Sequence, residues 1–159
     1  MGSGRRNSLL LRIGLLALLA AASCSQPPGD YEFLSAGEAA RDGGVYRFSA
    51  EFKDSTARYA FTLAARIVTS RVPDGTVDFD IRITAPNGET AIERVTFPLD
   101  DRPDVRIALG SGSVTDFAWP WPYRRPAWQP GLWQFAVQPA DPALRKVVRG
   151  VGFSYETTQ

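Results

Sequence analysis

The chain has 159 residues, with 18 Lys and Arg against 17 Asp and Glu, one cysteine and no histidine. These counts exclude His-dependent triads, Cys–His nucleophile pairs, and zinc, haem or iron–sulfur sites built from Cys and His. A single cysteine cannot form an intrachain disulfide, so a hydrophobic core must hold the fold. The near-neutral charge lacks the basic footprint of nucleic-acid binding. We therefore expect no nucleic-acid partner.

Residues 1–23 are predicted to be an export signal. Two arginines near the start precede an apolar run over residues 13–22, which is the order of a secretory signal. The run is far shorter than the roughly 20 residues that a membrane-spanning helix needs. The small residues Ala21-Ala22-Ser23 then stand directly before Cys24 and resemble a lipobox, where a peptidase cuts before a lipid-carrying cysteine. We expect a covalent lipid on Cys24, and an ordinary signal peptide with a chance cysteine is the alternative.

Residues 24–43 are predicted to be the lipidated N-terminus and tether. Loss of three arginines with the signal leaves 15 basic and 17 acidic residues, a net charge of −2. Attachment to a bilayer would thus come from acyl chains on Cys24 and not from basic side chains. Residues 25–29 are polar and rich in Pro and Gly, so they cannot pack a core. We expect residues 31–34 to dock on the domain and residues 35–40 to form one helical turn.

Residues 44–159 are predicted to form one all-β domain, because apolar and polar residues alternate with a period of two. Strands are predicted over residues 45–52, 59–67, 77–83, 90–99, 105–109, 133–137 and 151–155. Turns are predicted at 54–56, 73–75 and 86–88, where Asn87-Gly88 suits a tight hairpin. About seven strands joined by such turns indicate a single antiparallel β-sandwich, with a small closed β-barrel as the alternative.

All four tryptophans fall within the proline-rich segment 117–133. Its prolines exclude regular helix and interior strand, so the segment is predicted to be a loop or an irregular edge. It is either a face that binds protein or carbohydrate, or a plug whose tryptophans close the core. We expect Trp133 in the core and at least one of Trp119 and Trp121 exposed. The candidate partner-binding residues are Trp119, Trp121, Tyr123, Arg124, Arg125 and Trp128.

Several acids lie close together in the sequence. Asp78 and Asp80 share one face of a predicted strand, and Asp100, Asp101 and Asp104 follow in a loop. Paired carboxylates can perform acid–base chemistry or bind calcium. Alternating acids on a strand are usually its solvated face, and no calcium-loop pattern is present. We therefore expect no metal, no catalytic residues and no cofactor other than the lipid.

Five short motifs follow one another after the cysteine. They are Tyr31-x-Phe33, Asp54-Ser-Thr-x-x-Tyr59 with Arg66 at the end of the next strand, Pro86-Asn87-Gly88, Pro130-Gly131-Leu-Trp133-Gln-Phe135, and Leu144 followed by Gly150-Val-Gly152-Phe153. Their order and spacing resemble the gliding-motility lipoprotein family called GldH. The chain departs from that family over residues 68–73 and 101–128, the second of which is rich in Pro and Trp.

The resemblance implies a membrane-anchored, non-enzymatic lipoprotein that acts as a component or accessory of a gliding-motility and protein-secretion apparatus. Its partners would be the bilayer and other envelope proteins. A carbohydrate-binding lipoprotein of a glycan-uptake system is the alternative, and a carboxylate-dependent hydrolase is a third hypothesis that lacks a visible nucleophile. In bacteria with this family, surface-exported lipoproteins tend to carry acids just after the cysteine. Here no acid precedes Asp30, so we expect the outer membrane and a domain facing the periplasm.

Overall fold

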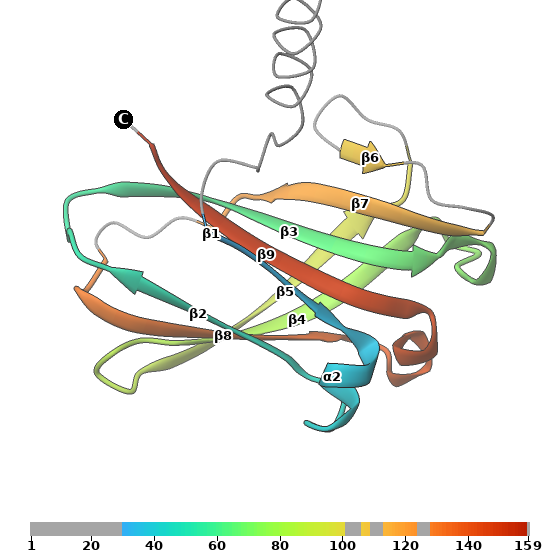
Figure 1. Ribbon diagram of the computed structural model, residues 1–159, viewed down its shortest axis with the longest axis horizontal. Helices are drawn as coiled ribbons and strands as arrows, with labels where there is room; N and C mark the ends of the chain where they lie inside the picture. Colours follow the sequence, from blue (N-terminus) through green and yellow to red (C-terminus); the bar gives the residue numbers. More distant parts are fainter. Residues whose placement is uncertain (1–29, 101–105, 109–112, 124–127, 159) are drawn as a thin grey trace, which may run out of the picture.

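Two antiparallel sheets pack face to face (Figure 1). The computed structural model describes residues 30–100, 106–108, 113–123 and 128–158. One sheet has five strands in the order β1-β9-β3-β7-β6, and the other has four in the order β2-β8-β4-β5. The two sheets are separate, so the predicted antiparallel β-sandwich is confirmed and the closed barrel is not formed by the described strands.

The described strands are β1 (Asp30–Ser35), β2 (Tyr46–Phe52), β3 (Arg58–Val68), β4 (Thr76–Thr84), β5 (Thr90–Pro98), β6 (Arg106–Ala108), β7 (Val114–Trp121), β8 (Gly131–Pro139) and β9 (Val148–Thr158). The described helical segments are α2 (Ala36–Ala40), η1 (Thr69–Arg71) and η2 (Pro142–Lys146). In these ranges, no helix has the length and apolar character that crossing a bilayer would require.

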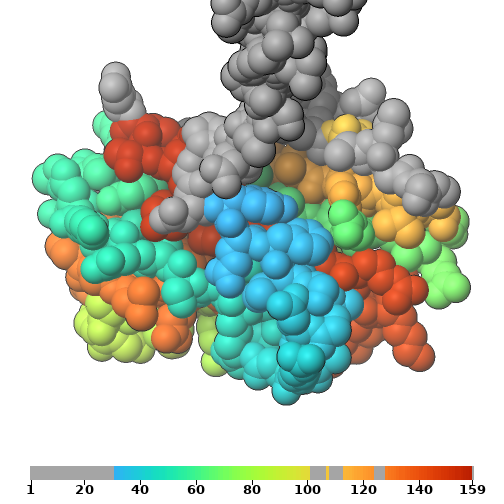
Figure 2. Space-filling model, in the orientation of Figure 1, coloured from blue at the N-terminus to red at the C-terminus, as the bar shows by residue number. Residues whose placement is uncertain are grey.

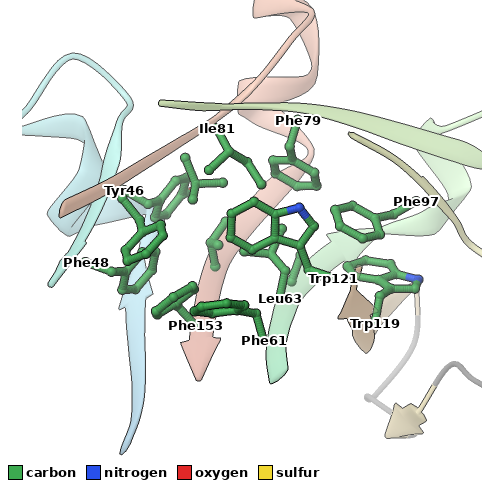
Figure 3. Packing of buried hydrophobic residues seen from close by; sticks show 14 of the residues in the cluster. Tyr46, Phe48, Phe61, Leu63, Phe79, Ile81, Phe97, Trp119, Trp121 and Phe153 are labelled. Atoms are coloured by element: carbon green, nitrogen blue, oxygen red, sulfur yellow. The ribbon is translucent and has the colours of Figure 1, made fainter. Parts of the chain in front are cut away.

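The core lies between the sheets and is built mainly by side chains that alternate along the strands (Figure 3). On β4 the inward residues Val77, Phe79, Ile81 and Ile83 are at most 2% exposed, whereas Arg82 on the opposite face is exposed. The two sheets meet through aromatic rings; for example, Phe153 of β9 lies 4.7 Å from Phe135 of β8. Burial of these apolar side chains is the main stabilising contribution to the fold. The predicted register of β4 is confirmed.

The sandwich begins earlier than residue 44. β1 pairs with β9 along all six of its residues, and α2 follows directly. The Glu38 carboxylate accepts the backbone N–H of Ser35 at 2.7 Å, while the Ser35 hydroxyl accepts that of Glu38 at 3.3 Å. This capping box starts the predicted helical turn. The expected boundary between residues 43 and 44 is wrong, because β1 becomes a strand by pairing with a segment more than 100 positions away.

β7 is a regular strand where the proline-rich sequence predicted a loop or an irregular edge. Pro120 stands opposite Thr62 of β3, within a continuous ladder from Val114 to Trp121. β6 pairs with residues 116–118 of β7, and in the described part of the chain Pro120 pairs with Thr62 of β3. A proline fits a strand position whose N–H is not needed for a ladder bond, because it has no N–H to donate.

The two ends of the sandwich carry different connections. β1 begins at Asp30, opposite Tyr155, and the same end holds the β2–β3 turn, the β4–β5 turn and the last residues of β9. We call this the proximal end, at the left in Figure 1. The distal end holds α2, η1 and η2. This division matters because the chain enters the domain at the proximal end.

Candidate functional site

All four tryptophans are core residues. Their exposed fractions are 2% for Trp119, 2% for Trp121, 3% for Trp128 and 0% for Trp133. The Trp119 ring lies 4.8 Å from Phe97, and its indole N–H donates to the Pro98 carbonyl oxygen at 2.8 Å. The expectation that Trp119 or Trp121 is exposed is therefore wrong. The prediction that Trp133 belongs to the core is confirmed.

The period of the strand explains this burial. Phe117, Trp119 and Trp121 alternate with Ala118 and Pro120, so the three large rings share the inner face of β7. Strand alternation thus places tryptophans inside and prolines outside. No face of a described tryptophan is open to a sugar ring or a protein partner.

The other candidate partner-binding residues lie around this plug. Tyr123 is half-buried and stacks on Trp121 with the ring centroids 4.8 Å apart. Trp128 packs edge-on against Phe52 at 4.7 Å. Arg124 and Arg125 lie outside the described residues. The structure therefore brings Trp121, Tyr123 and Trp128 together, but as parts of the core and its rim.

The acids of β4 lie on the outer face of the four-stranded sheet. The Arg94 guanidinium donates to both carboxylate oxygens of Asp80, at 2.7 and 2.9 Å. This hydrogen bonding holds the pKa of Asp80 below its ordinary value. Asp101 and Asp104 lie outside the described residues, and among the described ones no three potential ligands gather as a metal site would need.

The outer face of the five-stranded sheet carries a cluster that sequence reasoning did not assemble. Tyr31 and Phe33 of β1 lie over Gly152 and Gly150 of β9. A Cβ atom on Gly150 would lie 2.4 Å from Cζ of Phe33, and one on Gly152 would lie 2.7 Å from the Tyr31 hydroxyl oxygen. The rings therefore occupy space that is free only because both β9 residues lack side chains.

An ion pair completes this cluster. Arg66 of β3 stands opposite Asp116 of β7 and donates to both of its carboxylate oxygens, at 2.7 and 2.8 Å. The Arg66 guanidinium carbon also lies 5.4 Å from the centre of the Phe33 ring, within cation–π range. Burial, followed by the Asp116 charge, raises the pKa of Tyr31. We call Tyr31, Phe33, Arg66 and Asp116 the β1 clamp, because they join the first strand to the middle of the sheet.

The motifs behind the family resemblance meet one another in the fold. The Tyr-x-Phe motif packs on the Gly-Val-Gly motif through the contacts above. The hairpin motif meets the Pro-Gly motif, because a Cβ atom on Gly131 would lie 3.0 Å from Cγ of Pro86. Asp54 closes its own turn by accepting the Thr56 N–H at 2.8 Å. These residues therefore have a structural role in the fold. The Tyr-x-Phe and Gly-Val-Gly motifs are both visible in the sequence, and pairing them would have predicted the contact between β1 and β9.

Comparisons with known proteins identify no relative. No protein-family model, curated protein or solved structure matches the chain.

Proposed function

We propose that the protein is a lipid-anchored, non-enzymatic component or accessory of a gliding-motility and protein-secretion apparatus. Acyl chains on Cys24 hold it on a cell-envelope membrane, the outer membrane with the domain facing the periplasm. The observation that carries this proposal is the spacing between anchor and fold. The lipobox-like Cys24 stands six positions before Asp30, the first residue of a strand that belongs to the sandwich.

The β1 clamp supports an anchored role. β1 is an edge strand, and edge strands attached only by backbone pairing are easily detached. Here Phe33 is also held by Arg66, which is itself bound to Asp116 on a third strand. A force applied to the tether would therefore be distributed from β1 over β9, β3 and β7 through these contacts. Figure 2 shows β1 and α2, in blue, as a continuous part of the molecular surface.

The assignment to a gliding or secretion apparatus rests on the motif order shared with the GldH family. The contacts between those motifs give the shared order a structural meaning, since each pair determines where two distant strands meet. The carbohydrate-binding alternative depended on open tryptophan faces. The four buried rings provide none, so it receives no support from this segment.

Anchoring and partners can be tested together. The full-length protein with a C-terminal tag is expressed in its native cell, beside Cys24→Ala and the neighbouring control Ser25→Ala. We expect radioactive palmitate on the wild type and on Ser25→Ala, and none on Cys24→Ala. Equal labelling of Cys24→Ala would refute the lipoprotein assignment.

The same membranes then serve for capture. Envelope proteins of the motility or secretion machinery should co-purify with the wild type and with Ser25→Ala, and should be depleted with Cys24→Ala. Recovery of glycan-uptake components in their place would favour the carbohydrate alternative.

A further inference from the structure

The tether restricts how the domain stands on its membrane, and this inference rests on the proposed lipid at Cys24. Six residues carry the chain from Cys24 to Asp30, which spans at most about 20 Å when fully extended. β3 has 11 residues and is about 36 Å long. The tether therefore keeps Asp30, at the proximal end, within about 20 Å of the bilayer. A domain that stands on its proximal end would hold its distal end farther from the bilayer than the tether is long.

Three half-buried tyrosines gather at the proximal end. Tyr59 and Tyr123 lie 5.9 and 5.8 Å from the Trp128 ring, and Tyr155 lies 6.2 Å from Tyr59. Tyr46, at the other end of β2, is fully buried. A tyrosine with an apolar body and a polar tip suits the region between hydrocarbon and water, where this residue is enriched in membrane proteins.

The described residues of the β2–β3 and β4–β5 turns carry charges of both signs. Lys53 and Asp54 follow β2, and Glu89 follows the β4–β5 turn; all three are exposed. Charges of both signs give little net attraction to anionic headgroups. These described charges therefore give no preference for anionic lipid, and the contact is attributed to the tyrosines and the tether.

We infer that the proximal end of the sandwich rests against the phospholipid headgroup layer. Tyr59, Tyr123 and Tyr155 form the contact, and the long axis of the strands points away from the bilayer. The distal end, with α2, η1 and η2, is then presented to partners in the periplasm.

Two exposed serines at opposite ends of β3 make a matched test. Ser55 lies in the turn before β3 and Ser70 lies in η1 after it. The only natural cysteine carries its lipid through sulfur, so Ser55→Cys and Ser70→Cys each introduce the single reactive thiol. Each lipidated protein is labelled with a fluorophore and placed in phosphatidylethanolamine vesicles that contain a headgroup-nitroxide lipid, with and without phosphatidylglycerol.

We expect the label at residue 55 to be quenched severalfold more strongly than the label at residue 70, in both lipid mixtures. Asn87→Cys and Asp74→Cys form a second pair at the proximal and distal ends, which covers the failure of one variant to fold. Equal quenching at both ends, or stronger quenching at residue 70, would overturn the orientation while leaving the lipoprotein assignment intact. A protein mass without acyl chains would overturn the proposed function and the orientation together.

Discussion

Phe33 fills the space above Gly150 that a side chain would otherwise occupy. Cζ of Phe33 lies 2.4 Å, and the Leu34 carbonyl oxygen 3.0 Å, from the position of a Cβ atom on Gly150. A large ring and a residue without a side chain, more than 100 positions apart in the chain, are therefore complementary in size. The first strand stays on the sheet because the glycines of β9 leave space for its aromatic rings.

Gly150→Ala should lower the free energy of unfolding by about 1–3 kcal/mol, because the Phe33 ring and the strand behind it must move. The matched control is Gly37→Ala in α2, where the new Cβ would meet only the Ser35 hydroxyl at 3.8 Å. That control should be neutral or stabilising, by up to about 1 kcal/mol. Chemical denaturation measures both. Equal losses in the two variants would show that Phe33 does not depend on Gly150.

Trp119→Ala should cost about 3–5 kcal/mol, since it empties a fully buried site between Phe97 and Phe117. Trp119→Phe should cost less than Trp119→Ala, because it keeps a stacked ring in the site. Its remaining cost comes from the smaller ring and from the lost hydrogen bond to the Pro98 carbonyl oxygen. Thermal melting compares the variants. A Trp119→Ala protein that melts like the wild type and loses its co-purifying proteins would restore the partner-surface hypothesis.

Phe79 and Asp80 are neighbours on opposite faces of β4. Phe79→Ala should cost about 3–5 kcal/mol because its ring is completely buried. Asp80→Ala should cost less than about 1 kcal/mol, as is typical of ion pairs at a surface. Urea unfolding of the two variants checks the register of the strand, and a reversed order of the two costs would contradict it.

Stability should decrease on acidification, partly through Asp80. The Arg94 hydrogen bonds lower the pKa of Asp80 in the folded state below its ordinary value of 3.8. The carboxylate therefore stabilises the fold above pH 3.8, and this contribution disappears as the pH falls through the lower folded value. Asp80→Asn should make the acid limb of the stability curve shallower. An unchanged slope would exclude this carboxylate as a contributor.

The placement of the domain predicts its protease sensitivity. If it faces the periplasm, protease added to intact cells should leave the protein uncut, and the same protease should cut it after the outer membrane is permeabilised. Immunoblotting of both samples gives the result. Cleavage in intact cells would place the domain on the cell surface.

The sequence alone determined the parts of this protein whose cause is local. The alternation of Val77, Phe79 and Ile81 identified β4 and its buried face, and Asn87-Gly88 identified the hairpin, where Gly88 takes a φ of 87°. Because strand period and turn chemistry depend on neighbouring residues only, the β-sandwich could be predicted from them. The absence of histidine likewise restricted the possible chemistry before any fold was known.

Only the tertiary structure decided where the proline-rich and N-terminal segments go. Pro120 is accommodated within the ladder between β7 and β3, and this ladder depends on pairing with a distant segment. The burial of Trp119 follows from the pairing of β7 with β3. The prolines of this segment argued against a strand, so the pairing could not be predicted from the sequence. The β1 clamp needs Phe33, Arg66 and Gly150 on three paired strands. Such contacts depend on register between distant segments, which no local pattern records.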